Sequence, residues 1–103
     1  MTVTNSQSGT SVFEIAPKIY RISTPVPPGV IPGGFTFNQF LIVDDAPLLF
    51  HTGPRKMFPL VQQAVAHVLG DAGKLRYVNS KTMFTASFFQ LAHEDDLVAY
   101  FFY

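Results

Sequence analysis

The chain has 103 residues and a balanced charge, and these two properties limit the classes of protein it can belong to. Apolar residues make up 48% of the sequence and charged residues 14%, with seven basic and seven acidic side chains. This composition predicts a single folded domain rather than a disordered chain. Without blocks of like charge, we expect neither nucleic acid nor a membrane surface as a partner. The absence of cysteine excludes disulfides, thiolate metal sites and cysteine nucleophiles.

The first residues are polar, and residues 1–11 (MTVTNSQSGTS) are expected to form a disordered tail. They lack the basic start and apolar stretch of a secretory signal. No apolar run approaches the length needed to span a membrane. We therefore expect a soluble, cytoplasmic protein.

Alternating and apolar segments predict strands over the first half of the chain. Residues 13–22 are strand-like with a bend at Pro17, which lacks a backbone donor. Residues 24–34 hold four prolines and three glycines and predict a loop. The segment FTFNQFLIV, residues 35–43, predicts a strand whose apolar density suggests burial on both faces towards its end. A turn over residues 44–47 leads to a return strand at 48–51, so the pair predicts a hairpin.

The clearest helix of the sequence covers residues 57–69. Its apolar positions follow the i, i+3, i+4 pattern of one buried face, and Gly70 is a natural stop. The expected buried residues are Met57, Leu60, Val61, Ala64, Val65, Val68 and Leu69. A further strand is expected at residues 75–78, which makes residues 48–78 a βαβ unit with two parallel strands. The carboxyl ends of such strands form the edge where α/β proteins usually bind ligands, and His51 lies at that edge.

The order of these elements resembles a known family. A Pro/Gly-rich loop, FNQFLIVDDAPLLFHTGP, an amphipathic helix and LRYV are together similar to the metallo-β-lactamase fold, especially the diiron domain of flavodiiron and oxygen-binding diiron proteins. His51-Thr52-Gly53 stands where that family usually has Asp-Thr-Gly. The resemblance covers residues 12–78. It implies an α/β fold, a partial mixed sheet built from a hairpin and a βαβ unit, with one main helix.

The resemblance also implies where metal chemistry would lie. Members carry a His-x-His/Glu-x-Asp motif just after the strand that matches residues 75–78, and it holds a di-iron or zinc centre. The corresponding loop here reads NSKTMFTAS, with Thr82, Phe84 and Ala86 at the ligand positions. None of the three is a usual strong metal ligand. We therefore expect no cofactor and no catalytic residue in this chain.

Residues 79–103 differ in character from the rest and form the third expected segment, after the tail and the half-domain at 12–78. They contain no glycine or proline but hold five of the eleven phenylalanines. A helix is expected over residues 83–92 and a strand over 97–103. Our hypothesis is that a frame change, an alternative ending or a faulty gene model replaced the natural continuation. Self-association through an exposed sheet edge and the aromatic end is also expected.

Two histidines are the only weak metal candidates. His51 is interpreted as a strand-end residue that caps the following turn by hydrogen bonding; the alternative is a place in or beside a metal site. His93 opens the run His93-Glu94-Asp95-Asp96, which is interpreted as a solvated turn because four adjacent side chains rarely converge on one ion. Arg55 and Lys56 lack the glycine-rich cradle of a phosphate site.

Three functions remain open from the sequence. The first is a truncated protein of metallo-β-lactamase fold, flavodiiron-like but without the metal motif and without catalytic activity alone. The second is a metal-dependent hydrolase or a diiron protein that binds or reduces oxygen, completed by another chain. The third is a small non-catalytic interaction module.

Overall fold

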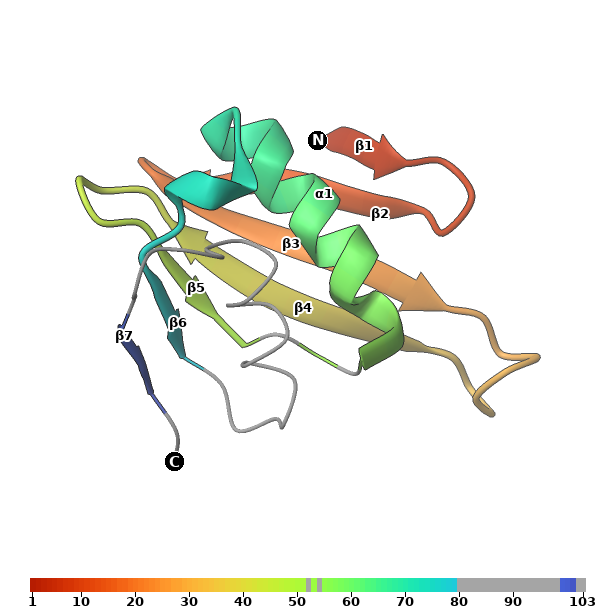
Figure 1. Cartoon of the computed structure of the whole chain (residues 1–103). Coiled ribbons are helices and arrows are strands. Elements are labelled where there is room, and N and C mark those ends of the chain that lie inside the picture. The colour runs from red at the N-terminus through yellow and green to blue at the C-terminus, as the bar shows by residue number, and fades with distance from the viewer. Residues whose placement is uncertain (52, 54, 80–98, 102–103) are drawn as a thin grey trace.

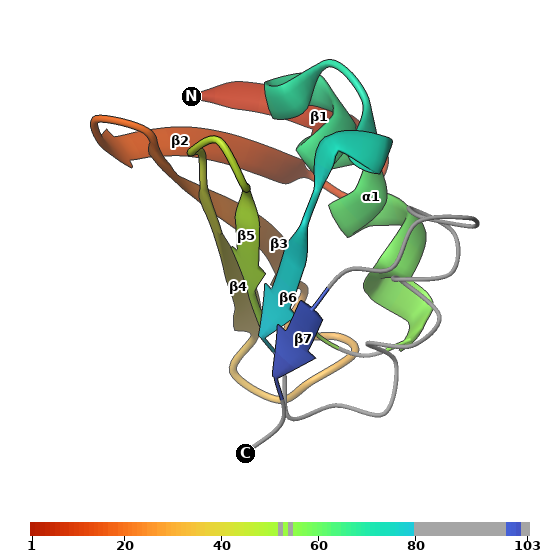
Figure 2. The ribbon, with the colours of Figure 1, turned by 60° about the vertical axis from the view of Figure 1, so that its left-hand side comes forward.

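The structure, a computed structural model, describes residues 1–51, 53, 55–79 and 99–101. Its strands form one sheet in chain order, with α1 (Phe58–Leu69) packed against one face (Figures 1 and 2). The strands are β1 (Thr2–Asn5), β2 (Thr10–Ala16), β3 (Ile19–Val26), β4 (Phe35–Ile42), β5 (Leu48–Phe50), β6 (Tyr77–Asn79) and β7 (Ala99–Phe101). Neighbours from β1 to β5 are antiparallel, whereas β5, β6 and β7 run parallel. The α/β class and the mixed sheet with one helix are confirmed.

The N-terminal segment is not a disordered tail, and that expectation was wrong. β1 and β2 form a hairpin in which Asn5 Oδ1 accepts hydrogen bonds from the backbone N–H and the hydroxyl of Ser8. Gly9 closes the turn with a φ of 77°. The Thr10 hydroxyl is fully buried and lies 2.8 Å from that of Thr24 in β3. Polar residues that pair with one another make this hairpin, so composition alone could not reveal it.

The long central strands follow the pleat of a sheet closely. β3 and β4 pair without interruption from Ile19 opposite Ile42 to Val26 opposite Phe35. β3 therefore extends two residues beyond Thr24, into the segment expected to be loop. In β4, Gln39 and Leu41 point to the face covered by α1, so Phe40 and Ile42 point to the other face.

The βαβ unit predicted from residues 48–78 is present. β5 is followed by a short 3-10 helix, η1 (Arg55–Met57), then α1, a second 3-10 helix, η2 (Ala72–Lys74), and β6. Leu49 of β5 pairs with Val78 of the parallel β6. Val61, Ala64 and Val65 bury the inner face of α1 against Ile22, Leu41 and Leu49 of the sheet. The helix ends at Gly70 in a left-handed conformation, as predicted.

The expected C-terminal elements lie partly outside the described residues. The helix over 83–92 and the run from His93 to Asp96 cannot be compared with the structure for that reason. The strand expected over 97–103 is present as β7, which pairs with β6 from Ala99 opposite Tyr77 to Phe101 opposite Asn79. In the described part of the chain, no helix has both the length and the hydropathy needed to cross a membrane.

Candidate functional site

The carboxyl ends of β5 and β6 lie side by side at one edge of the sheet, and this edge is the candidate site (Figure 1). Phe50 and Asn79 are opposite one another at the strand ends. The chain leaves β5 through His51 and Gly53 and enters η1 and α1 directly afterwards. The topology therefore gives His51 the position that the sequence predicted for it.

His51 is exposed and stands just outside the strand, with a φ of 67°. This left-handed conformation is uncommon for a residue with a Cβ, although histidine adopts it more readily than most. Its ring lies against that of Phe50, with 4.1 Å between the ring centroids and 57° between the planes. His51 forms no hydrogen bond with another described residue, so its expected capping bond is absent from this part of the chain. Among the described residues, the contact that holds the imidazole is the one with the Phe50 ring.

Beneath this turn lies a buried amide that the sequence analysis missed. Gln39 is 1% exposed, and its Oε1 has no hydrogen-bond partner among the described residues. A Cβ built on Gly53 would lie 2.9 Å from Gln39 Nε2 and 3.3 Å from Met57 Sδ. Gly53 therefore lets the backbone pass directly over the amide. The sequence signal that could have revealed this contact was Gln39 itself, a polar residue directly before the apolar run Phe40-Leu41-Ile42.

The edge holds little that could bind a metal. Within the described residues, no three His, Cys, Asp or Glu side chains come close enough to share an ion. Thr52 and residues 80–98, including Thr82, Phe84, Ala86 and His93, lie outside those residues. His67 is exposed on α1, away from the edge. The described side chains do not fit a di-iron or zinc centre, because a single imidazole is too few ligands for either.

Lys56 and the aromatic residues of β4 have ordinary surroundings. Lys56 is exposed in η1, and no acidic residue stands in the first turn of α1. Phe35 and Phe37 form an edge-to-face pair with 4.8 Å between ring centroids, and Phe37 also packs on the core. These contacts agree with a packing role for the aromatic residues of β4.

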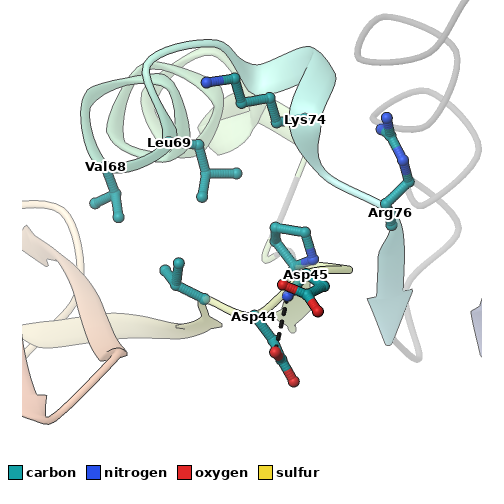
Figure 3. Close-up of a pocket in the computed structure, with 8 residues that line it drawn as sticks. Asp44, Asp45, Val68, Leu69, Lys74 and Arg76 are labelled. Atoms are coloured by element: carbon teal, nitrogen blue, oxygen red, sulfur yellow. Dashed lines mark hydrogen bonds between the residues drawn. The ribbon is translucent and has the colours of Figure 1, made fainter.

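A pocket of about 340 Å³ opens at the opposite end of the sheet (Figure 3). Val68 and Leu69 of α1 point into an apolar slot that Val43 also lines, while the charged side chains stand around its rim. Arg76 Nη1 donates to the carbonyl oxygens of Gly73 and Leu75, so part of that guanidinium is already bound. The pocket is open and its rim carries both signs of charge, from Asp44, Asp45, Lys74 and Arg76. The pocket therefore does not indicate which class of ligand it would bind.

One tyrosine on the helix-covered face has a shifted pKa. Partial burial and the neighbouring Glu14 carboxylate, which also hydrogen-bonds to the phenol, raise the pKa of Tyr20 above its ordinary value. Glu14 faces Tyr20 across the β2–β3 pair. The raised pKa favours the neutral phenol. Tyr20 and Glu14 lie in β3 and β2, which β4 separates from β5 and His51, so they are no part of the candidate site.

Comparison with solved structures identifies the fold. A flavo-diiron protein mutant from Thermotoga maritima matches with a TM-score of 0.66 and 13% identity over 88% of this chain and 26% of that chain. A diflavin flavoprotein fragment from Nostoc sp. PCC 7120 matches with a TM-score of 0.63 and 15% identity over 81% of this chain and 37% of its own. A mono-zinc metallo-β-lactamase from Erythrobacter litoralis matches with a TM-score of 0.59 and 17% identity over 81% of this chain and 40% of its own.

The chain therefore has part of the metallo-β-lactamase fold, as the sequence resemblance implied. It spans between 26% and 40% of the length of these matched chains. Identities this low establish the fold alone. By sequence, no family model matches the chain and no curated protein does. The iron and zinc in the names of the matched structures belong to those proteins.

Proposed function

We propose that this chain is a non-catalytic protein built on part of the metallo-β-lactamase fold, without a metal centre of its own. One observation carries the proposal. No His, Cys, Asp or Glu occurs from Ala72 to Ala92, the stretch that contains β6 and the residues that follow it in sequence. Zinc and iron sites need three or more such ligands held close together. The residues that follow β6 directly supply none.

The experiment is a metal titration followed on the histidine rings. The imidazole signals of uniformly labelled protein are recorded by NMR while Zn²⁺ is added up to about two equivalents. His67 is the internal control, because it is also an exposed histidine but lies on α1. The proposal predicts that His51 and His67 respond alike and weakly. Saturation of His51 alone at stoichiometric zinc would overturn it.

A second candidate function is favoured by the exposure of His51. Its imidazole is open to solvent and forms no hydrogen bond with another described residue, so it is available as one ligand. The chain would then be one part of a metal-dependent hydrolase or a diiron oxygen protein, with the remaining ligands from another chain. Stoichiometric metal uptake by the purified chain only after a second polypeptide is added, lost on His51→Ala, would support this function over the first.

A further inference from the structure

β1 forms one edge of the sheet, and its outer side pairs with no other strand of the described residues (Figures 1 and 2). An edge strand presents unpaired backbone N–H and C=O groups, and proteins usually protect such an edge with charged side chains or proline. From Met1 to Phe13 the chain contains no Lys, Arg, Asp, Glu or Pro. β1 instead exposes an apolar side chain, since Val3 is 52% exposed. The edge therefore lacks the side chains that usually prevent pairing with another strand.

Contacts with the rest of the chain hold β1 in place. Asn5 Nδ2 donates a hydrogen bond of 3.1 Å to Gln63 Oε1, and this bond ties the end of β1 to α1. A bulge between Val3 and Asn5 interrupts the pairing with β2, and it is the one feature of β1 that limits pairing on the outer side. Because β1 is already ordered, a strand that pairs with it does not have to order it first, which lowers the entropic cost of binding.

The sequence around Val3 reads the same in both directions, as Thr2-Val3-Thr4. Two antiparallel copies centred on Val3 place the two valines opposite one another and Thr2 opposite Thr4. Threonine pairs hydrogen-bond across antiparallel strands, and two opposed valines bury apolar surface. We propose that β1 pairs with β1 of a second copy of this chain, so that the two sheets become continuous across a two-fold axis.

The same axis brings the two copies of α1 towards one another. Two antiparallel neighbours in one sheet are related by an axis perpendicular to the sheet, so both helices lie on the same face. α1 contacts β1, and it contains no Lys, Arg, Asp or Glu, so the approach opposes no like charges. The short strand pairing and this contact form a small interface, and we expect a dimer that dissociates on dilution.

The first test is sedimentation of the purified full chain from low concentration up to its solubility limit. The proposal predicts a reversible monomer–dimer equilibrium that Val3→Lys weakens about tenfold or more, because two ammonium groups then oppose one another across the axis. Val30→Lys is the matched control and should leave the equilibrium unchanged, since Val30 is 72% exposed but lies between β3 and β4. Circular dichroism and thermal melting show that each variant still folds.

The second test determines the register of the pairing. The chain contains no cysteine, so a single introduced cysteine can form a disulfide only with another copy. Val3→Cys should form a disulfide-linked dimer under mild oxidation, because residues directly opposite one another in antiparallel strands have neighbouring Cβ atoms. Ser6→Cys is the control, since Ser6 is exposed in the turn after β1, and it should form far less dimer.

Three results would overturn the proposal. One is a chain that stays monomeric at every concentration. Another is a dimer that Val3→Lys leaves unchanged, or equal cross-linking of Val3→Cys and Ser6→Cys. The last is a different polypeptide that copurifies with the chain and is lost with Val3→Lys, which would make the edge a site for another protein. None of these outcomes depends on whether His51 binds metal, so the proposed function is tested separately.

Discussion

At the scale of single residues, the turn after β5 depends on a close fit between Gly53 and Gln39. Gly53 has a φ of 77°, and the space where its Cβ would lie is occupied by the Gln39 amide. His51 shares the left-handed conformation, so the chain reverses through two such residues within three positions. This geometry explains the glycine at position 53 without assigning a chemical role to the turn.

Gly53→Ala should therefore destabilise the fold by about 1–3 kcal/mol, because the substitution adds both backbone strain and a clash with Gln39 Nε2. Denaturant unfolding measures the change in free energy. Gly29→Ala is the matched control, since no atom lies within 4 Å of its Cβ position and its φ is not in the left-handed region. We expect the control to change stability by no more than about 0.5 kcal/mol. Equal effects would show that the turn is not tightly packed.

Gln39→Met should leave stability unchanged or raise it by up to about 1 kcal/mol. Methionine has a similar volume and removes a buried oxygen that has no partner in the described residues. Gln39→Ala is the comparison, and it should cost about 2 kcal/mol through the cavity that it leaves. A loss of more than about 2 kcal/mol in Gln39→Met would mean that the amide makes a hydrogen bond essential to the fold.

At the scale of secondary-structure elements, α1 shows how periodicity translates into packing. Val61, Ala64 and Val65 are fully buried, whereas Gln63 on the outer side is exposed and accepts a hydrogen bond from Asn5 Nδ2. The helix thus covers the sheet with a narrow stripe, and Val68 at its end is only half-buried. The stripe is the main contact between the two layers.

Val65→Asp should destabilise the protein severely, by about 3 kcal/mol or more, because it buries an unpaired charge between helix and sheet. Gln63→Asp, two residues away on the exposed side, should cost within about half a kcal/mol. Chemical denaturation of both variants makes the comparison. Similar losses in the two would show that the buried face of the helix lies elsewhere.

The sequence predicted the elements whose side chains follow a strict period. The seven apolar positions of the helix expected over residues 57–69 and the continuous apolar run of β4 identified the βαβ unit and the β4–β5 hairpin that leads into it. The β1–β2 hairpin was missed because it is stabilised by hydroxyl and amide groups such as Thr10 and Asn5, which have no apolar rhythm. The Gln39 contact was missed for a different reason: it joins residues that are far apart in sequence, and only the register of the sheet brings them together.

At the scale of the whole molecule, the described residues form two layers, a sheet and one helix (Figure 2). The face of the central strands that α1 covers holds the apolar core, whereas the other face mixes Phe40 and Ile42 with Arg21, Ser23 and Asn38. The sequence predicted burial on both faces at the end of β4. Within the described residues, α1 covers only one of these faces. The matched structures are about twice as long as this chain or longer, since between 81% and 88% of the chain covers between 26% and 40% of them. The described residues contain the strand–helix–strand unit of the fold, and the side chains on that unit decide what it can bind.

The central claim is that this unit carries no metal centre, and the metal content of the protein tests it most directly. The full chain is purified from cells supplied with iron and zinc, without chelators, and analysed by elemental mass spectrometry together with His51→Ala. The account predicts well below one metal ion per chain in both proteins, because the described residues at this edge offer a single imidazole, which is too few ligands for either ion. About two iron or zinc ions per wild-type chain, absent from His51→Ala, would contradict it.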